Sequence, residues 1–225
     1  MPRRRLLLFD IDGTLVSCGP QGRKVFRQAL LDVYGTAGDC DAYDFSGRTD
    51  PRIVLDLLIA AGLPEEQVLA GMPRLRELYL SELERVLDRD GMELLPGVQE
   101  LLESLDGRPN VTLALLTGNW EAGARIKLSR FGLNRFFPFG AFGSDATDRD
   151  DLPPVALERA ARHTGQAFRP EEALIIGDSV HDVGCARAHG IPVLGVATGR
   201  TAAKDLRRAG AEQVVGDLTR WRPAF

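Results

Sequence analysis

Short apolar runs alternate with longer segments of helical periodicity along most of this chain, and this alternation constrains the fold more than any other feature. The runs lie at residues 5–9, 111–116, 138–142, 173–177 and 192–197, each closed by Gly, Asp, Thr or Ser. Strands that are buried on both faces have this continuous apolar texture. The segments between them repeat apolar residues at helical spacing and finish near a glycine. Repeated strand–helix units predict an α/β protein with an open parallel sheet.

Residues 16–92 interrupt this alternation. They contain no convincing strand, and their pattern predicts helices near residues 22–34, 50–61 and 65–88. Pro96 and Gly97 then restart the strand–helix pattern. We therefore predict a helical insertion at residues 16–92 and a discontinuous core formed by residues 1–15 and 93–225.

Composition and charge exclude several classes of protein. Hydrophobic residues make up 44% and charged residues 27% of the chain, as in ordinary globular domains. The apolar runs are far shorter than the roughly 20 residues of a membrane-spanning helix. Asp10 and Asp12 interrupt any signal-peptide core at the basic start of the chain. A net charge of −4 gives no sign of a nucleic-acid or membrane surface.

The cysteines argue against two further kinds of structure. The chain has three cysteines and no CxxC pair, which argues against a disulfide framework or a cysteine-rich zinc site. We expect a cytoplasmic protein whose partner is a small molecule rather than a nucleic acid or a membrane. The sequence favours no particular oligomeric state.

Two aspartates follow the first apolar run, in the segment Phe9-Asp10-Ile11-Asp12-Gly13-Thr14. Ligands of open α/β sheets bind beyond the carboxyl ends of the strands. Two carboxylates at that place repel each other unless a cation lies between them. The segment therefore indicates a functional site, although Asp and Gly are also common in plain turns.

A second acidic pair, Asp178 and Asp182, follows the apolar run at residues 173–177. If the two strands are neighbours, both acidic pairs converge at one edge of the sheet. Such an all-oxygen set suits Mg²⁺, which binds through carboxylates and a substrate phosphate.

Thr117, Gly118 and Asn119 close the run at residues 111–116. A hydroxyl and free backbone N–H groups at a strand-to-helix junction can hold a phosphate oxygen. The alternative is that Thr117 or Asn119 only caps the following helix.

In order and spacing, these segments resemble the first, second and fourth motifs of the haloacid dehalogenase superfamily. The insertion lies where phosphoglycolate-phosphatase-like members carry a helical cap. The resemblance implies a Rossmann-like core with helices on both faces of its sheet, a mobile cap, and Mg²⁺-dependent phosphoryl transfer through an aspartyl-phosphate.

The resemblance also implies a role for each residue. Asp10 is the expected nucleophile, and Asp12 the general acid and then base. Asp10, Asp178 and the backbone carbonyl of Asp12 are expected to hold Mg²⁺, with Asp182 beside them. Thr117, Gly118 and Asn119 are expected to position the phosphate oxygens.

One departure from the family pattern concerns the lysine of its Lys-Pro-x-Pro motif. Asp151-Leu152-Pro153-Pro154 occupies that place here. Arg149 and Lys127 are the candidate replacements for the missing charge. We favour Arg149, because it lies just before the helix that the prolines begin. The alternative is that Arg149 pairs with Asp148 or Asp150 at the surface.

The insertion contains one candidate substrate residue, Arg48, in the segment Ser46-Gly47-Arg48-Thr49. Its guanidinium suits a carboxylate or a phosphate, although a plain surface arginine explains the pattern equally well.

Phosphatase activity on a small phosphorylated metabolite is the favoured function. A phosphoglucomutase-like phosphotransferase keeps both aspartates and stays open. A haloacid dehalogenase has no need of Asp12, and a binding module gains little from converging carboxylates, so both are less favoured.

Overall fold

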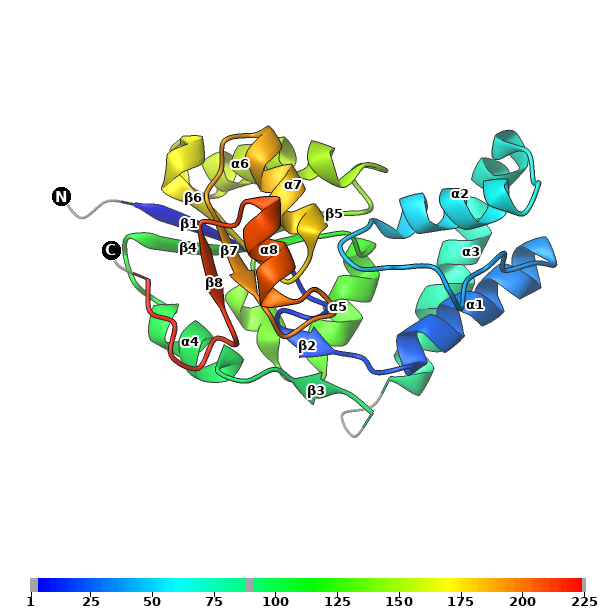
Figure 1. Cartoon of the computed structure of the whole chain (residues 1–225), viewed down its shortest axis with the longest axis horizontal. Helices are drawn as coiled ribbons and strands as arrows, with labels where there is room; N and C mark the ends of the chain where they lie inside the picture. The colour runs from blue at the N-terminus through cyan, green and yellow to red at the C-terminus, as the bar shows by residue number, and fades with distance from the viewer. Residues whose placement is uncertain (1–3, 88–90, 224–225) are drawn as a thin grey trace.

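The computed structural model describes residues 4–87 and 91–223. Its centre is a six-stranded parallel sheet with the strand order β5-β4-β1-β6-β7-β8 (Figure 1). The strands are β1 (Arg5–Phe9), β4 (Val111–Thr117), β5 (Gly140–Phe142), β6 (Ala173–Gly177), β7 (Val193–Val196) and β8 (Gln213–Val215). All the strands predicted from apolar runs are confirmed. The short, partly exposed β8 has no such run and was not predicted.

Helices cover both faces of the sheet, as predicted. In β1, Leu7 and Phe9 face one hydrophobic cluster, whereas Leu6 and Leu8 face the other, and all four are fully buried. Helices α4 (Val98–Leu105) and α5 (Glu121–Ser129) pack on the first face. The second face is covered by α6 (Leu152–Thr164), α7 (Val180–Ala188) and α8 (Ala203–Ala209). Three short 3₁₀ turns complete this part: Leu133–Phe136, Arg149–Asp151 and Pro170–Glu172.

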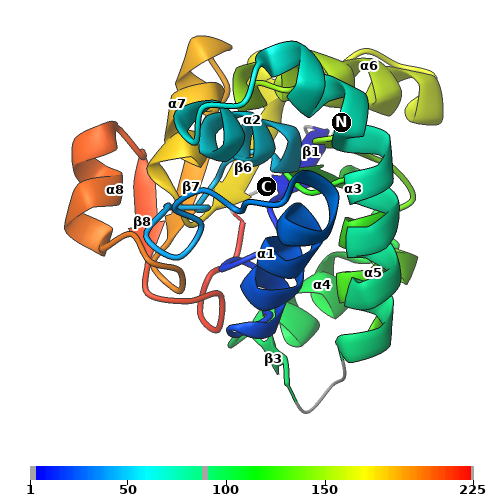
Figure 2. The same ribbon diagram turned by 90° about the vertical axis from the view of Figure 1, so that its right-hand side faces the viewer.

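The insertion forms a separate group of helices beside the carboxyl ends of the strands (Figure 2). They are α1 (Gln21–Tyr34), α2 (Asp50–Ala60) and α3 (Glu65–Val86). All three helices were predicted, and the predicted end of the last one, residue 88, lies outside the described residues. The division into core and cap stays a prediction.

Two short strands connect the insertion to the sheet. β2 (Val16–Ser17) pairs antiparallel with β3 (Glu93–Leu94), so the chain enters and leaves the insertion side by side. This pairing was not predicted, because two residues are too few to show a strand period.

Aromatic side chains join the insertion to the sheet domain. Phe26 of α1 stacks on Trp120, which precedes α5, with ring centroids 6.3 Å apart, and Tyr79 of α3 lies 5.8 Å from the same indole. These contacts seat the insertion over the edge of the sheet where the strands end.

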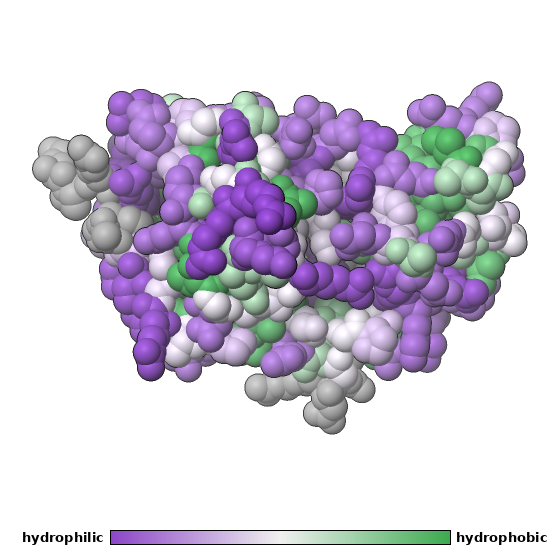
Figure 3. All heavy atoms as spheres, in the orientation of Figure 1, coloured by the Kyte–Doolittle hydropathy of each residue, from purple (hydrophilic) through white to green (hydrophobic). Residues whose placement is uncertain are grey.

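The surface in Figure 3 is mostly hydrophilic, with hydrophobic colour at the outer end of the insertion and in patches over the rest of the molecule. Within residues 4–87 and 91–223, no helix is long and apolar enough to cross a membrane.

Candidate active site

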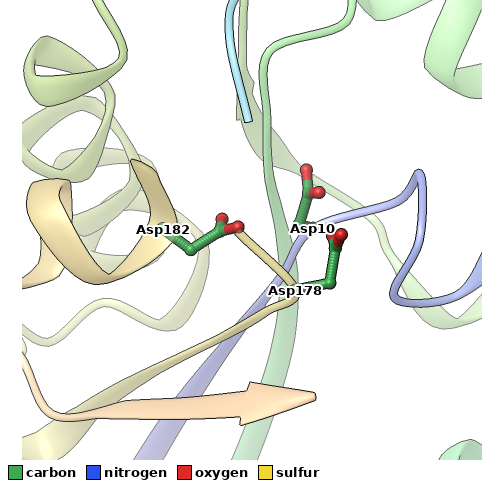
Figure 4. A group of neighbouring side chains, drawn as sticks. All are labelled: Asp10, Asp178 and Asp182. Carbon is green, nitrogen blue, oxygen red and sulfur yellow. The ribbon is translucent and has the colours of Figure 1, made fainter. Parts of the chain in front are cut away.

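Three buried carboxylates meet at the carboxyl ends of the central strands. Asp10 follows β1, Asp178 follows β6, and Asp182 lies in the first turn of α7. One oxygen from each can be chosen so that all three lie within 4.8 Å of one another (Figure 4). They meet because β1 and β6 are neighbours, with Phe9 level with Ile176.

Two glycines make room for the Asp178 carboxylate. A Cβ atom on Gly13 would lie 2.5 Å from Asp178 Oδ2, and one on Gly199 would lie only 1.6 Å from it. Gly13 also has a φ of +84°, which favours glycine. Thr14 Oγ1 donates to Asp178 Oδ1 over 3.3 Å. The Gly-Thr pair after Asp12 therefore shapes the acidic site.

Asp182 has a second role in the local fold. Its Oδ2 accepts hydrogen bonds from the Ser179 backbone N, at 3.0 Å, and from Ser179 Oγ, at 2.6 Å. The Asp182 backbone N in turn donates to Ser179 Oγ over 3.2 Å, which completes a capping box at the start of α7. The other carboxylate oxygen, Oδ1, accepts from Arg149 Nη2.

The charges of this cluster favour a bound cation. Burial, with smaller contributions from the nearby Asp182 and Asp12, raises the pKa of Asp10 to about 7 against the opposing effect of Arg149. Burial, Asp182 and Asp10 likewise hold the pKa of Asp178 well above its usual range. A divalent cation would offset the repulsion between these buried carboxylates, and an all-carboxylate donor set suits Mg²⁺. The residues present therefore fit a magnesium ion.

Arg149 reaches this cluster from the 3₁₀ turn before α6. It is 7% exposed, and its Nη2 lies 3.2 Å from Asp10 Oδ1 and also bonds Asp182. Its Nη1 donates to the carbonyl of Gly47 in the insertion over 3.1 Å. The alternative of a surface pair with Asp148 or Asp150 is therefore wrong.

Lys127 reaches the neighbouring carboxylate, Asp12. Its Nζ lies 2.7 and 2.8 Å from the two Asp12 oxygens and 2.6 Å from Asn119 Oδ1. Because α5 begins only at Glu121, Lys127 is about 9 Å of helix rise from its start, within reach of a long side chain. Both candidate cations thus lie in the site, each beside a different aspartate.

The Asp12 side chain is not one of the three clustered carboxylates; it lines the cavity and is partly buried, with 42% of it exposed. Burial alone would raise the pKa of Asp12, but the Lys127 ammonium and hydrogen bonds from Lys127 and Asn119 outweigh it and lower that pKa. Asp12 is thus held as a carboxylate in the free protein.

Thr117 and Asn119 form a buried polar pair at the end of β4. Asn119 Nδ2 donates to Thr117 Oγ1 and to Asp12 Oδ2, each over 2.8 Å. Neither residue caps α5, whose N-cap is Trp120, without a side-chain capping bond. The capping alternative is therefore wrong, and these polar groups line the cavity instead.

A cavity of about 400 Å³ opens between the sheet edge and the insertion. Arg48 lines it, with Nη1 3.4 Å from Asp56 and the guanidinium 5.4 Å from the Tyr43 ring centroid. Other residues that line the cavity were not predicted from the sequence, and among them are Cys18, Arg23, Asp50 and Arg200. They lie outside the strand-end motifs, and no local pattern distinguishes them from ordinary loop or helix residues.

Known proteins of similar sequence carry phosphatase names. The chain is 27% identical to a phosphoglycolate phosphatase of Pseudomonas syringae pv. tomato, over 97% of this chain and 79% of the relative. It is 28% identical to a phosphoglycolate phosphatase of Mesorhizobium japonicum, over 88% of this chain and 85% of that protein.

Solved structures agree on the fold. A hydrolase from Pseudomonas syringae matches with a TM-score of 0.68 and 25% identity, over 96% of this chain and 95% of the other. A putative haloacid dehalogenase-like hydrolase from Bacteroides fragilis matches with a TM-score of 0.71 and 22% identity, over 96% and 99% of the two chains. The family model described as haloacid dehalogenase-like hydrolase matches residues 7–196, most of the chain. With strand-end motifs, fold and family model in agreement, this chain belongs to the haloacid dehalogenase-like hydrolases.

Proposed function

We propose that this enzyme is a Mg²⁺-dependent phosphatase that hydrolyses a small, phosphoglycolate-like phosphomonoester through an aspartyl-phosphate on Asp10. The observation that carries the proposal is the meeting of Asp10, Asp178 and Asp182 beside a cavity that also contains Asp12. The phosphatase names of similar proteins support it. The cytoplasmic location expected from the sequence stays a prediction.

Asp10 and Asp12 divide the chemistry between them. A carboxylate oxygen of Asp10 attacks phosphorus, and the bond from phosphorus to the substrate oxygen breaks. Protonated Asp12 gives its proton to that leaving oxygen. A water molecule then attacks the phosphorus of the aspartyl-phosphate while Asp12 takes its proton, and Asp10 returns as a carboxylate.

Asp12 needs a proton before the first step, although Lys127 lowers its pKa in the free protein. A dianionic phosphate in the cavity brings negative charge close to Asp12 and raises the pKa of its carboxyl. Substrate binding therefore favours protonation of Asp12, and Lys127 holds the carboxyl in place through both oxygens.

Asp10, Asp178 and the Asp12 backbone carbonyl are the groups that would hold Mg²⁺, with Asp182 beside them. When bound, the ion would neutralise the nucleophile and the phosphate so that the two anions can approach each other. Arg149 supplies a fixed positive charge at Asp10 from the protein itself.

The remaining polar groups of the cavity account for binding. Thr117 and Asn119 carry the hydroxyl and amide that position phosphate oxygens. Arg48 approaches from the insertion and suits a second anionic group, such as a substrate carboxylate. The insertion would act as a cap that closes over the substrate and excludes water.

A panel of phosphorylated metabolites and one aryl phosphate, assayed with Mg²⁺ or EDTA, tests this proposal. We expect phosphate release that needs Mg²⁺, and acid quenching should trap a phosphoryl group on the peptide that contains Asp10. Asp10→Asn should abolish both signals, whereas Asp39→Asn, a change at an exposed aspartate, should leave both unaltered.

Three outcomes would contradict the proposal. Full activity after exhaustive chelation excludes the metal, and transfer of the phosphoryl group to a sugar rather than water indicates a phosphotransferase. Halide release from a haloacid, without phosphate release from any ester, indicates a dehalogenase.

A further inference from the structure

A buried aspartate of the insertion, Asp50, forms hydrogen bonds to the backbone on both sides of Asn119, at the expected phosphate-binding segment Thr117-Gly118-Asn119. Asp50 is the first residue of α2 and is 8% exposed. Its backbone N donates to the Gly118 carbonyl, and its Oδ2 accepts a hydrogen bond from the Trp120 backbone N, each over 2.8 Å. The two partners are the residues on either side of Asn119.

Asn119 is the residue on which these two hydrogen bonds act. Its side chain joins Thr117, Asp12 and Lys127 into one network. Its backbone carbonyl accepts from the Gly143 N over 2.9 Å, which is an anchor from the sheet domain itself. The position of the Asn119 amide thus depends on anchors from both the sheet domain and the insertion.

The insertion approaches this segment so closely that only glycine fits at position 118. A Cβ atom on Gly118 would lie 2.0 Å from the Arg48 carbonyl oxygen and 2.8 Å from Thr49 Cα. Backbone is packed directly on backbone at this point, so the hydrogen bonds of Asp50 are not loose surface contacts.

Neighbouring residues hold Asp50 in register. Thr49 Oγ1 donates to the Thr147 carbonyl of the sheet domain and also accepts from the Arg52 backbone N over 3.2 Å, as the N-cap of α2. Arg52 Nε donates to Asp148 over 3.0 Å. These contacts place the start of α2 as a unit on the strand-end loops.

We propose that Asp50 is a positioning residue that sets the geometry of Thr117, Gly118 and Asn119 only while the insertion is seated on the sheet domain. The proposal rests on the proposed phosphatase function for its kinetic consequences. Seating the insertion completes the phosphate-binding segment, and lifting the insertion withdraws both hydrogen bonds that flank Asn119. The competing explanation is that Asp50 only stabilises the N-terminus of α2 through the helix dipole.

Asp50→Ala, Asp50→Asn and the control Glu65→Ala separate these explanations. Glu65 is the exposed first residue of α3, so its removal tests the helix-dipole effect at the matching position. In Asp50→Asn, the amide oxygen can still accept from the Trp120 N. The readouts are kcat and KM for an aryl phosphate, and hydrogen exchange of the Trp120 amide, which needs no turnover.

We expect Asp50→Ala to lower kcat by about tenfold to a hundredfold, the scale of a small misplacement of binding groups. Trp120 amide exchange should accelerate in this variant, whereas Asp50→Asn should stay within about threefold of the wild type in kcat and keep most of the protection. Glu65→Ala should match the wild type in both. In an Asn119→Ala background, Asp50→Ala should cost little more, because both changes act through one group.

Unchanged Trp120 exchange in Asp50→Ala would overturn the role of Asp50. A loss of kcat in the double variant equal to the product of the two single losses would overturn it too, because the two residues would then act independently. If Asp50→Ala does not fold, a loss of kcat of about tenfold or more in Asp50→Asn with unchanged Trp120 exchange would overturn it as well, because activity would then fall while the hydrogen bond to Trp120 persists. A wild-type protein that hydrolyses no phosphomonoester would contradict the proposed function instead, since amide exchange reports on Asp50 independently.

Discussion

Replacing Arg149 by alanine is the sharpest test of how the site balances its charge. Arg149 Nη2 lies 3.2 Å from Asp10 Oδ1 and also bonds Asp182, and all three side chains are buried. Removing one partner from a buried ion pair typically costs about 3–5 kcal/mol, because the remaining charge is left without compensation. In this protein Asp10 can instead lose its charge by taking up a proton.

The direction of that response follows from the pKa of Asp10. Burial raises this pKa to about 7 although Arg149 opposes the rise, so without Arg149 it must rise further. In the metal-free protein at neutral pH, Asp10 would then be mostly protonated, and Mg²⁺ would have to displace that proton before Asp10 could attack phosphorus. We expect Arg149→Ala to lower turnover by on the order of tenfold to a thousandfold. The acid limb of its pH–rate profile should move to higher pH.

The assay is aryl phosphate hydrolysis across pH at a fixed excess of Mg²⁺, with Arg149→Lys and Lys127→Ala for comparison. Arg149→Lys keeps a positive charge and should recover part of the lost turnover. Lys127→Ala should raise the pKa of Asp12 and leave the acid limb of the profile, which is assigned to Asp10, where it is in the wild type. Stability in EDTA gives a second readout. Because the folded-state pKa of Asp10 lies above its unfolded value, stability falls as pH rises from about 4 toward 7, and Arg149→Ala should extend this fall to higher pH.

Two results would refute this reasoning. Near-wild-type turnover of Arg149→Ala with an unmoved acid limb would show that Arg149 does not balance the nucleophile. A larger loss in Lys127→Ala, accompanied by a shift of the Asp10 limb, would assign that role to Lys127.

Three further changes test other parts of the site. Asp10→Asn should abolish turnover yet raise the melting temperature in EDTA at pH 8, since a buried charge disappears; residual near-native turnover would mean that another group is the nucleophile. Asp12→Asn should slow both formation and breakdown of the aspartyl-phosphate by about a hundredfold to ten-thousandfold, measured by rapid quench; an unchanged rate in either step would remove Asp12 from that step. Mg²⁺ should raise the melting temperature more at pH 8 than at pH 5.5, because the raised pKa values of Asp10 and Asp178 leave fewer carboxylates to bind it in acid; equal shifts at both pH values would contradict this charge balance.

The strands of the parallel sheet, and the acidic residues that follow two of them, were accessible from sequence patterns, whereas the strand order that makes β1 and β6 neighbours was not. Strands buried on both faces need continuous apolar runs, so β1, β4 and β6 are visible without a structure. The carboxyl ends of parallel strands lie at one edge, so polar residues that follow such runs are brought together. The pairing of β2 with β3 was not accessible, because two residues carry no period. The edge strand β8 was not accessible because its partly exposed residues form no continuous apolar run.

Only the tertiary structure decided which charges meet which aspartates. Arg149 was favoured over Lys127 from its place before α6, yet both reach the site, because α5 starts late enough for Lys127 to approach Asp12. In the sequence, Asp50 is indistinguishable from an ordinary first residue of a helix before a proline. Its hydrogen bond to the Trp120 backbone N depends on where the insertion packs against the sheet domain. Local periodicity records which faces of a segment are buried, whereas contacts between segments far apart in the chain are set by packing, which no single stretch of sequence encodes.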